Sequence, residues 1–308
     1  MSDVAQISPA APVAAENEGQ STVTMRILKT AWRSKAFQFG FWIFVILVVT
    51  SLILPLVSPV SATKMAIREK FLPPLFLGEG WSWIHPLGTD QLGRDMLMRC
   101  MVGLRYSLMI GIITVVLMFI VGCGLGLLAG FKGKWWDTII MRITDAQLSL
   151  PMIILAITIL GISKPSVASI IVVLGLSGWP LYARVARSAA VTEREKEYVR
   201  GLRVVGAGDW RILLLYAAPN ILPPIAFVAV LDIARMMIFE SILGFLGLGI
   251  QPPTPSFGSI IADARTYLIN AWWIATSPGV FLAVALTAIN LMGASLEKAR
   301  NTVYAGAR

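Results

Sequence analysis

Long uncharged stretches alternate with shorter polar segments along this 308-residue chain. The uncharged stretches are largely apolar and cover residues 39–57, 106–131, 146–163, 165–183, 212–231 and 266–296. An α-helix rises about 1.5 Å per residue and the hydrocarbon core of a bilayer is about 30 Å thick, so about 20 apolar residues cross it. The pattern therefore predicts an all-α integral membrane protein with six transmembrane helices.

The segments between these stretches refine the prediction. Little more than residues 161–165 separates the third stretch from the fourth, which predicts a tight helical hairpin. Residues 241–250 are apolar but too short to cross, and the prolines of residues 251–255 cannot continue a helix. We therefore expect an interfacial or re-entrant piece there rather than a seventh crossing.

The N-terminal region contains a tail and a first membrane anchor. Residues 1–25 are rich in Ala, Ser, Glu and Gln and lack a hydrophobic period, which is typical of a disordered tail. Residues 60–62 resemble a signal-peptide processing site. However, the apolar region of a signal peptide is about 7–15 residues long and lies nearer the terminus, so residues 39–57 are interpreted as a retained anchor.

The sidedness follows from the basic residues. Six crossings place both termini on one side of the membrane. If that side is cytoplasmic, the inner segments carry 17 Lys and Arg residues and the outer segments carry 7. Because basic residues accumulate in cytoplasmic segments, both termini are predicted to be cytoplasmic.

Composition agrees with a membrane protein and narrows the possible partners. The chain is 56% hydrophobic and only 14% charged, compared with about 25% charged residues in soluble proteins. Its net charge of +9 is explained by the cytoplasmic segments, so we expect a lipid bilayer as a partner and no nucleic acid. The two cysteines are too few for a disulfide framework.

No catalytic or metal site is expected. The chain has no Gly-x-x-x-x-Gly-Lys-Ser/Thr loop to hold ATP phosphates. Residues 175–178 read Gly-Leu-Ser-Gly, but an intramembrane serine nucleophile needs a nearby base, and the only histidine is His85 in the outer loop. One histidine and two cysteines also provide no usual zinc or haem ligand set.

Two groups of residues inside the stretches have alternative interpretations. A stripe of small residues lets helices approach closely, either within this chain or against another subunit; its members are Gly122, Gly126 and Gly130. Asp232 and Arg235 share a helix face, with Glu240 near the outer end. Charges at membrane depth are either neutralised by pairing or line a solute path, where Arg235 would attract a carboxylate.

The segment between the fourth and fifth stretches is unusually organised for a loop. Residues 193–205 read as a short helix, residues 206–208 (Gly-Ala-Gly) break it, and Asp209 is expected to cap the next helix. We call residues 193–218 the elbow. Because a solvated loop needs no such organisation, the elbow is predicted to dock a soluble partner.

The elbow resembles the coupling loop of bacterial ABC importer permeases. The family pattern is Glu-Ala-Ala, three residues, Gly, nine residues, Ile-x-Leu-Pro, and Gly206 and Pro219 match its glycine and proline. Residues 200–202 read Arg-Gly-Leu in place of Glu-Ala-Ala, and Tyr216 and Ala218 replace the Ile and Leu.

Other motifs resemble the dipeptide/oligopeptide/nickel permeases, and specifically their C-type subunit. Residues 85–95, HPLGTDQLGRD, are similar to an outer motif of this family. Residues 245–258, FLGLGIQPPTPSFG, and the cytoplasmic motifs around residues 136–145 and 178–184 agree with the family as well. The outer-motif residues singled out by the resemblance are Gly88, Thr89, Asp90, Gly93, Arg94 and Asp95.

The resemblance implies a type I ABC importer permease fold in the bacterial inner membrane. It divides the chain into a tail (1–25), an N-terminal segment with the first helix and outer loop (26–102), a permease domain (103–296) and a C-terminal tail (297–308). The ATPase-coupling residues that it implies are Glu197, Arg200, Gly201, Arg203, Gly206, Asp209, Arg211 and Pro219.

The implied function is that of a non-enzymatic permease subunit of an ATP-driven importer. Its partners would be a second, non-identical permease, two ABC ATPases and an extracytoplasmic solute-binding protein. This chain would bind no cofactor, because Mg-ATP is used by the ATPases. The expected solutes are di- and oligopeptides. Nickel chelates, glutathione or opine-like solutes are alternatives within the class, and a self-contained secondary transporter or channel is the alternative outside it.

Overall fold

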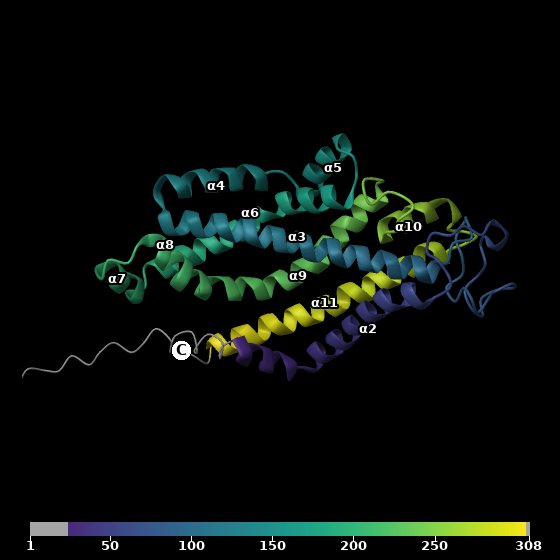
Figure 1. The fold of residues 1–308 in the computed structure, drawn as a ribbon, viewed down its shortest axis with the longest axis horizontal. Helices are drawn as coiled ribbons and strands as arrows, with labels where there is room; N and C mark the ends of the chain where they lie inside the picture. Colours follow the sequence, from purple (N-terminus) through teal and green to yellow (C-terminus); the bar gives the residue numbers. More distant parts are fainter. Residues whose placement is uncertain (1–23, 306–308) are drawn as a thin grey trace, which may run out of the picture.

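The fold is a bundle of long helices with an irregular region at one end. The structure is a computed structural model that describes residues 24–305. Figure 1 shows α2 (Lys35–Val57), α3 (Met96–Lys132), α6 (Val167–Arg194), α9 (Ala218–Phe245) and α11 (Trp273–Ala305) running along the bundle. Within the described residues the only β pairing is an isolated bridge between Thr89 and Asp95. The predicted all-α class is therefore confirmed.

Five helical segments of the described chain are long and apolar enough to cross a membrane. They are Lys35–Val57, Met96–Lys132, Val167–Arg194, Asp209–Phe245 and Trp273–Ala305. The third predicted crossing has a different form. It consists of α4 (Lys134–Leu148) and α5 (Met152–Ile162), which are bent by 84° relative to each other and give a sixth crossing if the pair is one span.

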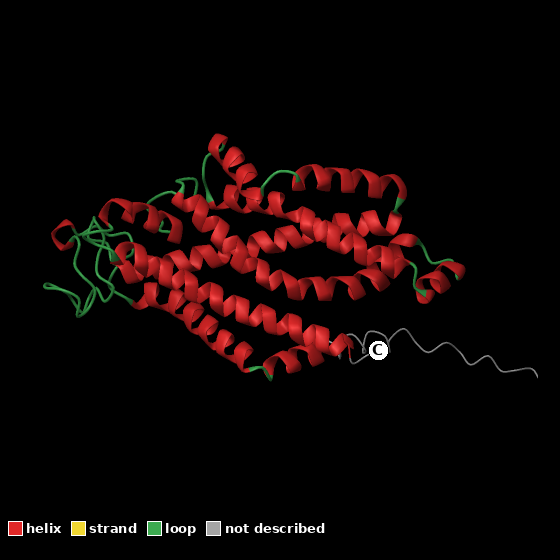
Figure 2. Ribbon diagram, turned by 180° about the vertical axis from the view of Figure 1, so that it is seen from behind, coloured by secondary structure: helices red, strands yellow, loops and turns green. Residues whose placement is uncertain are grey.

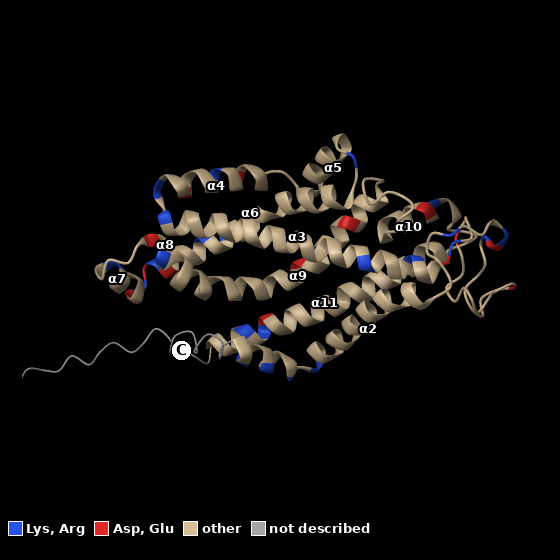
Figure 3. Ribbon diagram, viewed as in Figure 1, with Lys and Arg blue, Asp and Glu red and all other residues tan. Residues whose placement is uncertain are grey.

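The break in the third crossing has a local cause. Pro151 precedes α5 and has no N–H to continue a helix, and proline disfavours helical backbone at the residue before it. The uncharged stretch that predicts this crossing begins only at Ala146, because the charges of α4 interrupt the apolar pattern before it. In the structure these charges lie along an amphipathic helix (Figure 3).

The predicted piece over residues 241–250 is not separate from the fifth crossing. α9 continues without interruption to Phe245 and ends where Gly247 adopts a left-handed φ of 81°. The short separate helix at this end is α10 (Phe257–Ala264), which begins after the proline-rich turn with a capping box between Ser256 and Ser259. The last crossing also begins later than predicted, because residues 265–267 form a 3-10 turn before α11.

The glycine stripe packs inside this chain. A Cβ at Gly122 would lie 2.5 Å from the carbonyl oxygen of Trp179, and one at Gly130 would lie 2.5 Å from that of Arg187. A Cβ at Gly126 would overlap the backbone of Ala183. All three contacts join α3 to α6, which decides between the two interpretations of the stripe.

Two large apolar clusters fill the bundle. One lies among α3, α5, α6 and α9, and the other joins α2, α3, α9, α10 and α11. Many large apolar side chains remain exposed along the spans, including Trp42 and Ile46 of α2. In a bilayer such side chains are in contact with lipid or with another subunit.

Both ends of the described chain lie at the same end of the bundle as the elbow (Figure 1). The irregular loop after α2 lies at the opposite end, as Figure 2 shows. This arrangement agrees with an even number of crossings. Residues 1–23 of the predicted N-terminal tail lie outside the described residues, whereas residues 297–305 of the predicted C-terminal tail continue α11. The predicted domain boundary at residues 102 and 103 falls within α3.

Candidate functional site

The elbow is a helix–turn–helix at the end of the bundle. α7 (Glu197–Val204) is followed by Gly206, whose φ of 83° is left-handed, and then by α8 (Asp209–Ile212). A π-helical turn, Leu213–Ala217, joins α8 directly to α9. The predicted glycine break is therefore present, and Gly206 adopts a backbone conformation that glycine tolerates most easily.

The predicted cap at Asp209 is wrong. Gly208 is the N-cap of α8, no side chain caps the helix, and Asp209 is its first residue. The Asp209 carboxylate instead lies 3.5 Å from Lys132 Nζ at the end of α3 and 3.7 Å from Arg203 Nε of α7. Lys132 also lies over the Trp210 ring, 5.3 Å from its centroid. Asp209 therefore links the two elbow helices to α3.

The outer side of the elbow is exposed and partly apolar. Val204 and Val205 are 89% and 81% exposed, whereas Val199 on the opposite side of α7 is fully buried. Glu197, Gly201 and Arg211 are also exposed, and Pro219 lies in the first turn of α9. Because Val204 and Val205 are consecutive apolar side chains that project into solvent, this tip of the elbow is suited to contact another protein.

Ion pairs strengthen the start of the elbow. Arg200 donates a hydrogen bond of 3.2 Å to Glu195, and Lys196 lies 2.9 Å from Glu193. The bond from Arg200, and then the one from Arg194, hold the pKa of the Glu195 carboxyl below its usual range. The buried side of the elbow includes a hydrogen bond of 2.7 Å from the Tyr198 hydroxyl to Glu193.

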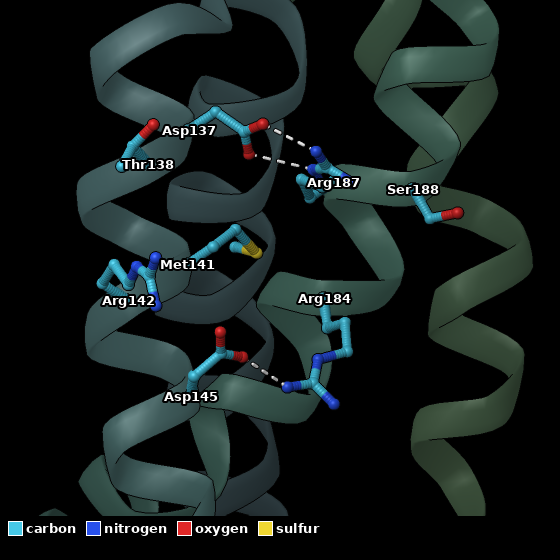
Figure 4. A pocket seen from close by; sticks show the side chains of 8 residues that line it. All are labelled: Asp137, Thr138, Met141, Arg142, Asp145, Arg184, Arg187 and Ser188. Atoms are coloured by element: carbon cyan, nitrogen blue, oxygen red, sulfur yellow. Dashed lines mark hydrogen bonds and ion pairs between the residues drawn. The ribbon is translucent and has the colours of Figure 1, made fainter.

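A polar groove of about 480 Å³ lies between α4 and α6 (Figure 4). Arg187 donates two hydrogen bonds to Asp137, at 2.9 and 2.6 Å. Two turns along α4, Asp145 accepts a hydrogen bond of 2.7 Å from Arg184. Arg142 lies between these pairs on α4, and Figure 4 draws no bond from it to the labelled side chains. The two ion pairs hold the amphipathic α4 against α6.

These ion pairs were not predicted from the sequence. Asp137 and Asp145 are eight residues apart, which places them on one helix face, and Arg184 and Arg187 are one turn apart. These spacings indicate that the members of each set share a helix face, although they do not identify the partner. This indication was missed because α4 was interpreted as a loop, where spacing does not define a face.

Asp232 and Arg235 of α9 form the predicted mutual pair. Arg235 Nη2 lies 2.9 Å from Asp232 Oδ1, and the Tyr182 hydroxyl of α6 donates a 2.6 Å hydrogen bond to Asp232 Oδ2. The Arg235 side chain is 43% exposed and that of Asp232 is 14% exposed. The pair therefore neutralises its charges and still presents the guanidinium at a surface of this chain.

Glu240 does not join that pair. Its side chain is fully buried, and Oε2 accepts a hydrogen bond of 2.7 Å from Ser107 of α3. The structure thus brings Asp232 and Arg235 together and places Glu240 in the packing between α3 and α9.

The outer motif folds the outer loop onto the helix ends. Asp95 caps α3 by accepting a 2.6 Å hydrogen bond from the backbone N–H of Met98, and its other carboxylate oxygen lies 2.8 Å from His85 Nδ1. Thr89 accepts a 2.9 Å hydrogen bond from the backbone N–H of Leu72, and its carbonyl accepts one from Trp273. Gly88 and Gly93 have left-handed φ angles of 75° and 72°.

A buried ionic network lies beside this motif, and we call it the outer network. Arg94 Nε lies 2.6 Å from Asp90, and Arg99 Nη1 lies 3.2 Å from the same carboxylate. Both arginines also lie 3.4 Å from Asp263 of α10. Asp90 and Arg99 are almost completely buried. The network therefore ties the outer loop and the start of α3 to α10.

More than half of the chain, residues 122–301, matches the family model of the binding-protein-dependent transport system inner membrane component. The chain belongs to this family. Like other members, it is a permease component of a binding-protein-dependent ABC importer and a multi-pass protein of the inner membrane. Membership implies ATPase and binding-protein partners.

Similar permeases of this family cover nearly the whole chain. The di/tripeptide transport system permease protein DppC of Pseudomonas aeruginosa is 38% identical, over 88% of this chain and 91% of that protein. The dipeptide transport system permease proteins DppC of Haemophilus influenzae and Escherichia coli are 35% and 37% identical. They cover 83% and 90% of this chain, and the alignments include 87% and 93% of those proteins.

A solved structure, that of the MetNI methionine ABC transporter in inward-facing conformations, is also similar to this permease. The match has a TM-score of 0.48 and 20% identity, and covers 67% of this chain and 96% of that chain.

Proposed function

We propose that this permease is the C-type subunit of a di- and oligopeptide importer. It forms the solute path with a second, non-identical permease, and an extracytoplasmic binding protein delivers the peptide. Two ABC ATPases bind and hydrolyse Mg-ATP, while this chain binds no cofactor and catalyses no reaction. Support comes from the DppC relatives, which are named as dipeptide or di/tripeptide permeases and align over most of the chain.

The observation that carries the coupling proposal is the construction of the elbow. Its exposed Val204 and Val205 offer a contact for an ATPase, and its other side is fixed to the bundle by Val199 and Asp209. Because α8 continues through the π-helical turn into α9, a displacement of the elbow also moves the base of a transmembrane helix. This is the connection that ATP-driven alternating access needs.

Coupling requires that the elbow bind two states of the ATPase with different affinities. Closure of the ATPases around ATP would pull the elbows of the two permeases together and turn the spans toward the outer side, and hydrolysis would reset them. Gly206 sets the angle between α7 and α8, since its left-handed backbone is costly for other residues. This assignment predicts that a bulky residue there changes the shape of the elbow.

The Asp232–Arg235 pair is the proposed polar lining of the path. Arg235 keeps a half-exposed guanidinium that would attract the carboxylate of a peptide, and Tyr182 holds its partner Asp232 in place. The α4–α6 groove would lie at the cytoplasmic mouth of the same path, because charged side chains at the membrane usually face water or a partner. Arg235→Ala should lower peptide uptake without abolishing assembly.

The coupling proposal can be tested with two glycines that differ only in backbone conformation. A Cβ at Gly206 or at Gly208 meets no atom within 4 Å, but only Gly206 has a left-handed φ. We expect Gly206→Val to assemble normally and to lose ATP-driven uptake, whereas Gly208→Val should keep most of it. The measurements are peptide uptake into proteoliposomes and ATPase activity of the complex. Normal uptake by Gly206→Val would refute the proposal.

The solute class is tested separately. Calorimetry on the cognate binding protein, with dipeptides, tripeptides, glutathione and a nickel chelate, gives the order of affinities. Uptake through the complete transporter should follow that order, with peptides first. A preference for the nickel chelate in both assays would contradict the peptide assignment and leave the permease function intact.

A further inference from the structure

A groove of about 340 Å³ lies at the outer end of the bundle, where α2 ends beside α3. We call it the outer groove. One cation and several hydroxyl groups line it, and they come from three separate segments: Ser58, Ser61 and Thr63 after α2, Arg105 and Tyr106 of α3, and Thr254 of the proline-rich turn. A groove with this lining has the donors that an oxyanion requires.

Arg105 is the unusual member of this lining. Among the described residues it forms no ion pair, unlike Arg94 and Arg99 on the preceding turns of the chain. Its guanidinium carbon lies 5.8 Å from the centroid of the Tyr106 ring. The side chain is exposed, so its charge is available to a ligand.

The outer groove lies at the level of the lipid headgroups. Ser58 is the C-cap of α2 and therefore marks the outer end of the first crossing. Arg105 is the last charged residue before the 26 uncharged residues 106–131, which extend about 39 Å as a helix and are enough to cross the hydrocarbon core. Both elements independently place the groove at the boundary between hydrocarbon and water.

An apolar stripe begins directly below Arg105. Met109, Ile112, Val116 and Ile120 are exposed and follow Arg105 at intervals of three or four residues, which places them on one face of α3. The stripe contains no polar side chain over about four turns. A cation with hydroxyl groups above an exposed apolar stripe matches the shape and chemistry of a phospholipid, with its phosphate above and its acyl chains below.

We propose that the outer groove binds the phosphate of an anionic phospholipid of the outer leaflet, with acyl chains along the stripe. A peptide path is a poorer match, because a purely apolar stripe offers no hydrogen bonds to peptide groups. A second permease packed on this face is also a poorer match, since it would cover Arg105, which has no counter-charge in the described chain. The inference does not depend on which solute is transported.

The experiment is native mass spectrometry of the full-length chain, purified in detergent with its partner subunits and titrated with palmitoyl-oleoyl-phosphatidylglycerol. We expect one tightly bound lipid in the wild type and at least fivefold weaker binding in Arg105→Gln, with most of the affinity kept in Arg105→Lys. Lys164→Gln is the matched control, because Lys164 is an exposed cation in the α5–α6 connection and does not line the groove. Its affinity should equal that of the wild type.

Two further probes separate the headgroup from other sources of binding. Dioleoylglycerol has acyl chains and no phosphate, so its binding should be the same in the wild type and in Arg105→Gln. Inorganic phosphate should not displace the bound phosphatidylglycerol. Unchanged phosphatidylglycerol binding in Arg105→Gln, equal loss in Lys164→Gln, an Arg105 effect on dioleoylglycerol of the same size, or displacement by inorganic phosphate or by a dipeptide would each overturn the proposal.

Discussion

Gly122 and Gly124 provide a matched pair of positions for measuring the α3–α6 contact. Both lie in the cytoplasmic half of α3, two residues apart, and therefore on different faces. A Cβ at Gly122 would lie 2.5 Å from both the Trp179 carbonyl oxygen and Tyr182 Cβ. A Cβ at Gly124 would meet no atom within 4 Å. Replacing each glycine by alanine adds the same methyl group to the same helix.

The size of the effect follows from the distances. Ordinary contact begins at 3.4 Å, so the methyl group of Gly122→Ala must be accommodated by moving α3 and α6 apart by about 0.9 Å. A gap of 0.5–1 Å forfeits about a quarter to a half of the dispersion energy of the facing atoms. Overpacking of this kind destabilises a protein by about 1–3 kcal/mol. The helix-propensity gain is the same for both variants and cancels in their difference.

The assay is thermal unfolding of both purified variants in one detergent, followed by tryptophan fluorescence. For a chain of this size 1 kcal/mol corresponds to about 2 °C, so the Tm of Gly122→Ala should lie about 2–6 °C below that of Gly124→Ala. Gly124→Ala should match or exceed the wild type. Equal Tm values for the two variants would show that α3 and α6 are not in close contact along this stripe.

Three other experiments test the polar contacts. Asp90→Asn should destabilise the chain by about 3–5 kcal/mol, because it leaves two buried arginines with less counter-charge. The expected result is a large decrease in Tm. Asp263→Asn, which changes a more exposed carboxylate of the same network, should not reproduce this decrease. A double-mutant cycle with Asp137→Ala and Arg187→Ala should give a coupling free energy of about 1 kcal/mol in unfolding experiments. Additive effects of the two substitutions would show that this ion pair does not stabilise the packing of α4 against α6. Arg200→Gln should raise the lowered pKa of Glu195 toward its ordinary value. Because the folded-state pKa is lowered, the Glu195 contribution to stability is present above its unfolded pKa and is lost as pH falls through the folded pKa. An NMR titration that finds the same Glu195 pKa in the wild type and in Arg200→Gln would show that the bond from Arg200 does not lower this pKa.

The sequence predicted the crossings best where a long apolar stretch folds as part of one unbroken helix. Residues 39–57 lie within α2, and residues 106–131 lie within α3, because hydropathy alone requires a helix in hydrocarbon. The helix ends were less accurate, since turns that contain charged residues, such as residues 96–105 with Arg99 and Arg105, continue α3 outside the uncharged stretch. Pro151 caused the largest difference, because its effect on the direction of the chain depends on how α4 packs.

In the candidate site, too, features that depend on local sequence could be predicted and features that depend on tertiary packing could not. The left-handed conformation at Gly206 and the Asp232–Arg235 pair could be predicted, because both depend on neighbours within a few residues in the sequence. The pairs of α4 with α6, the bond from Tyr182 to Asp232 and the burial of Glu240 depend on tertiary packing. Spacing on one helix cannot identify a partner on another, so the sequence could name Glu240 and not its separation from Arg235.

The continuity of α8, the π-helical turn and α9 has a mechanical consequence. Residues 209–245 form one rod of 37 residues, about 55 Å long, which reaches from the elbow to the end of the bundle where α10 lies. A rod held at both ends must either transmit a displacement or bend where it is most compliant. Its compliant points are the π-helical turn and the two prolines of residues 223–224, all in its cytoplasmic half. The outer half therefore moves as a stiff lever arm, and the outer network that holds α10 bears the load at its end.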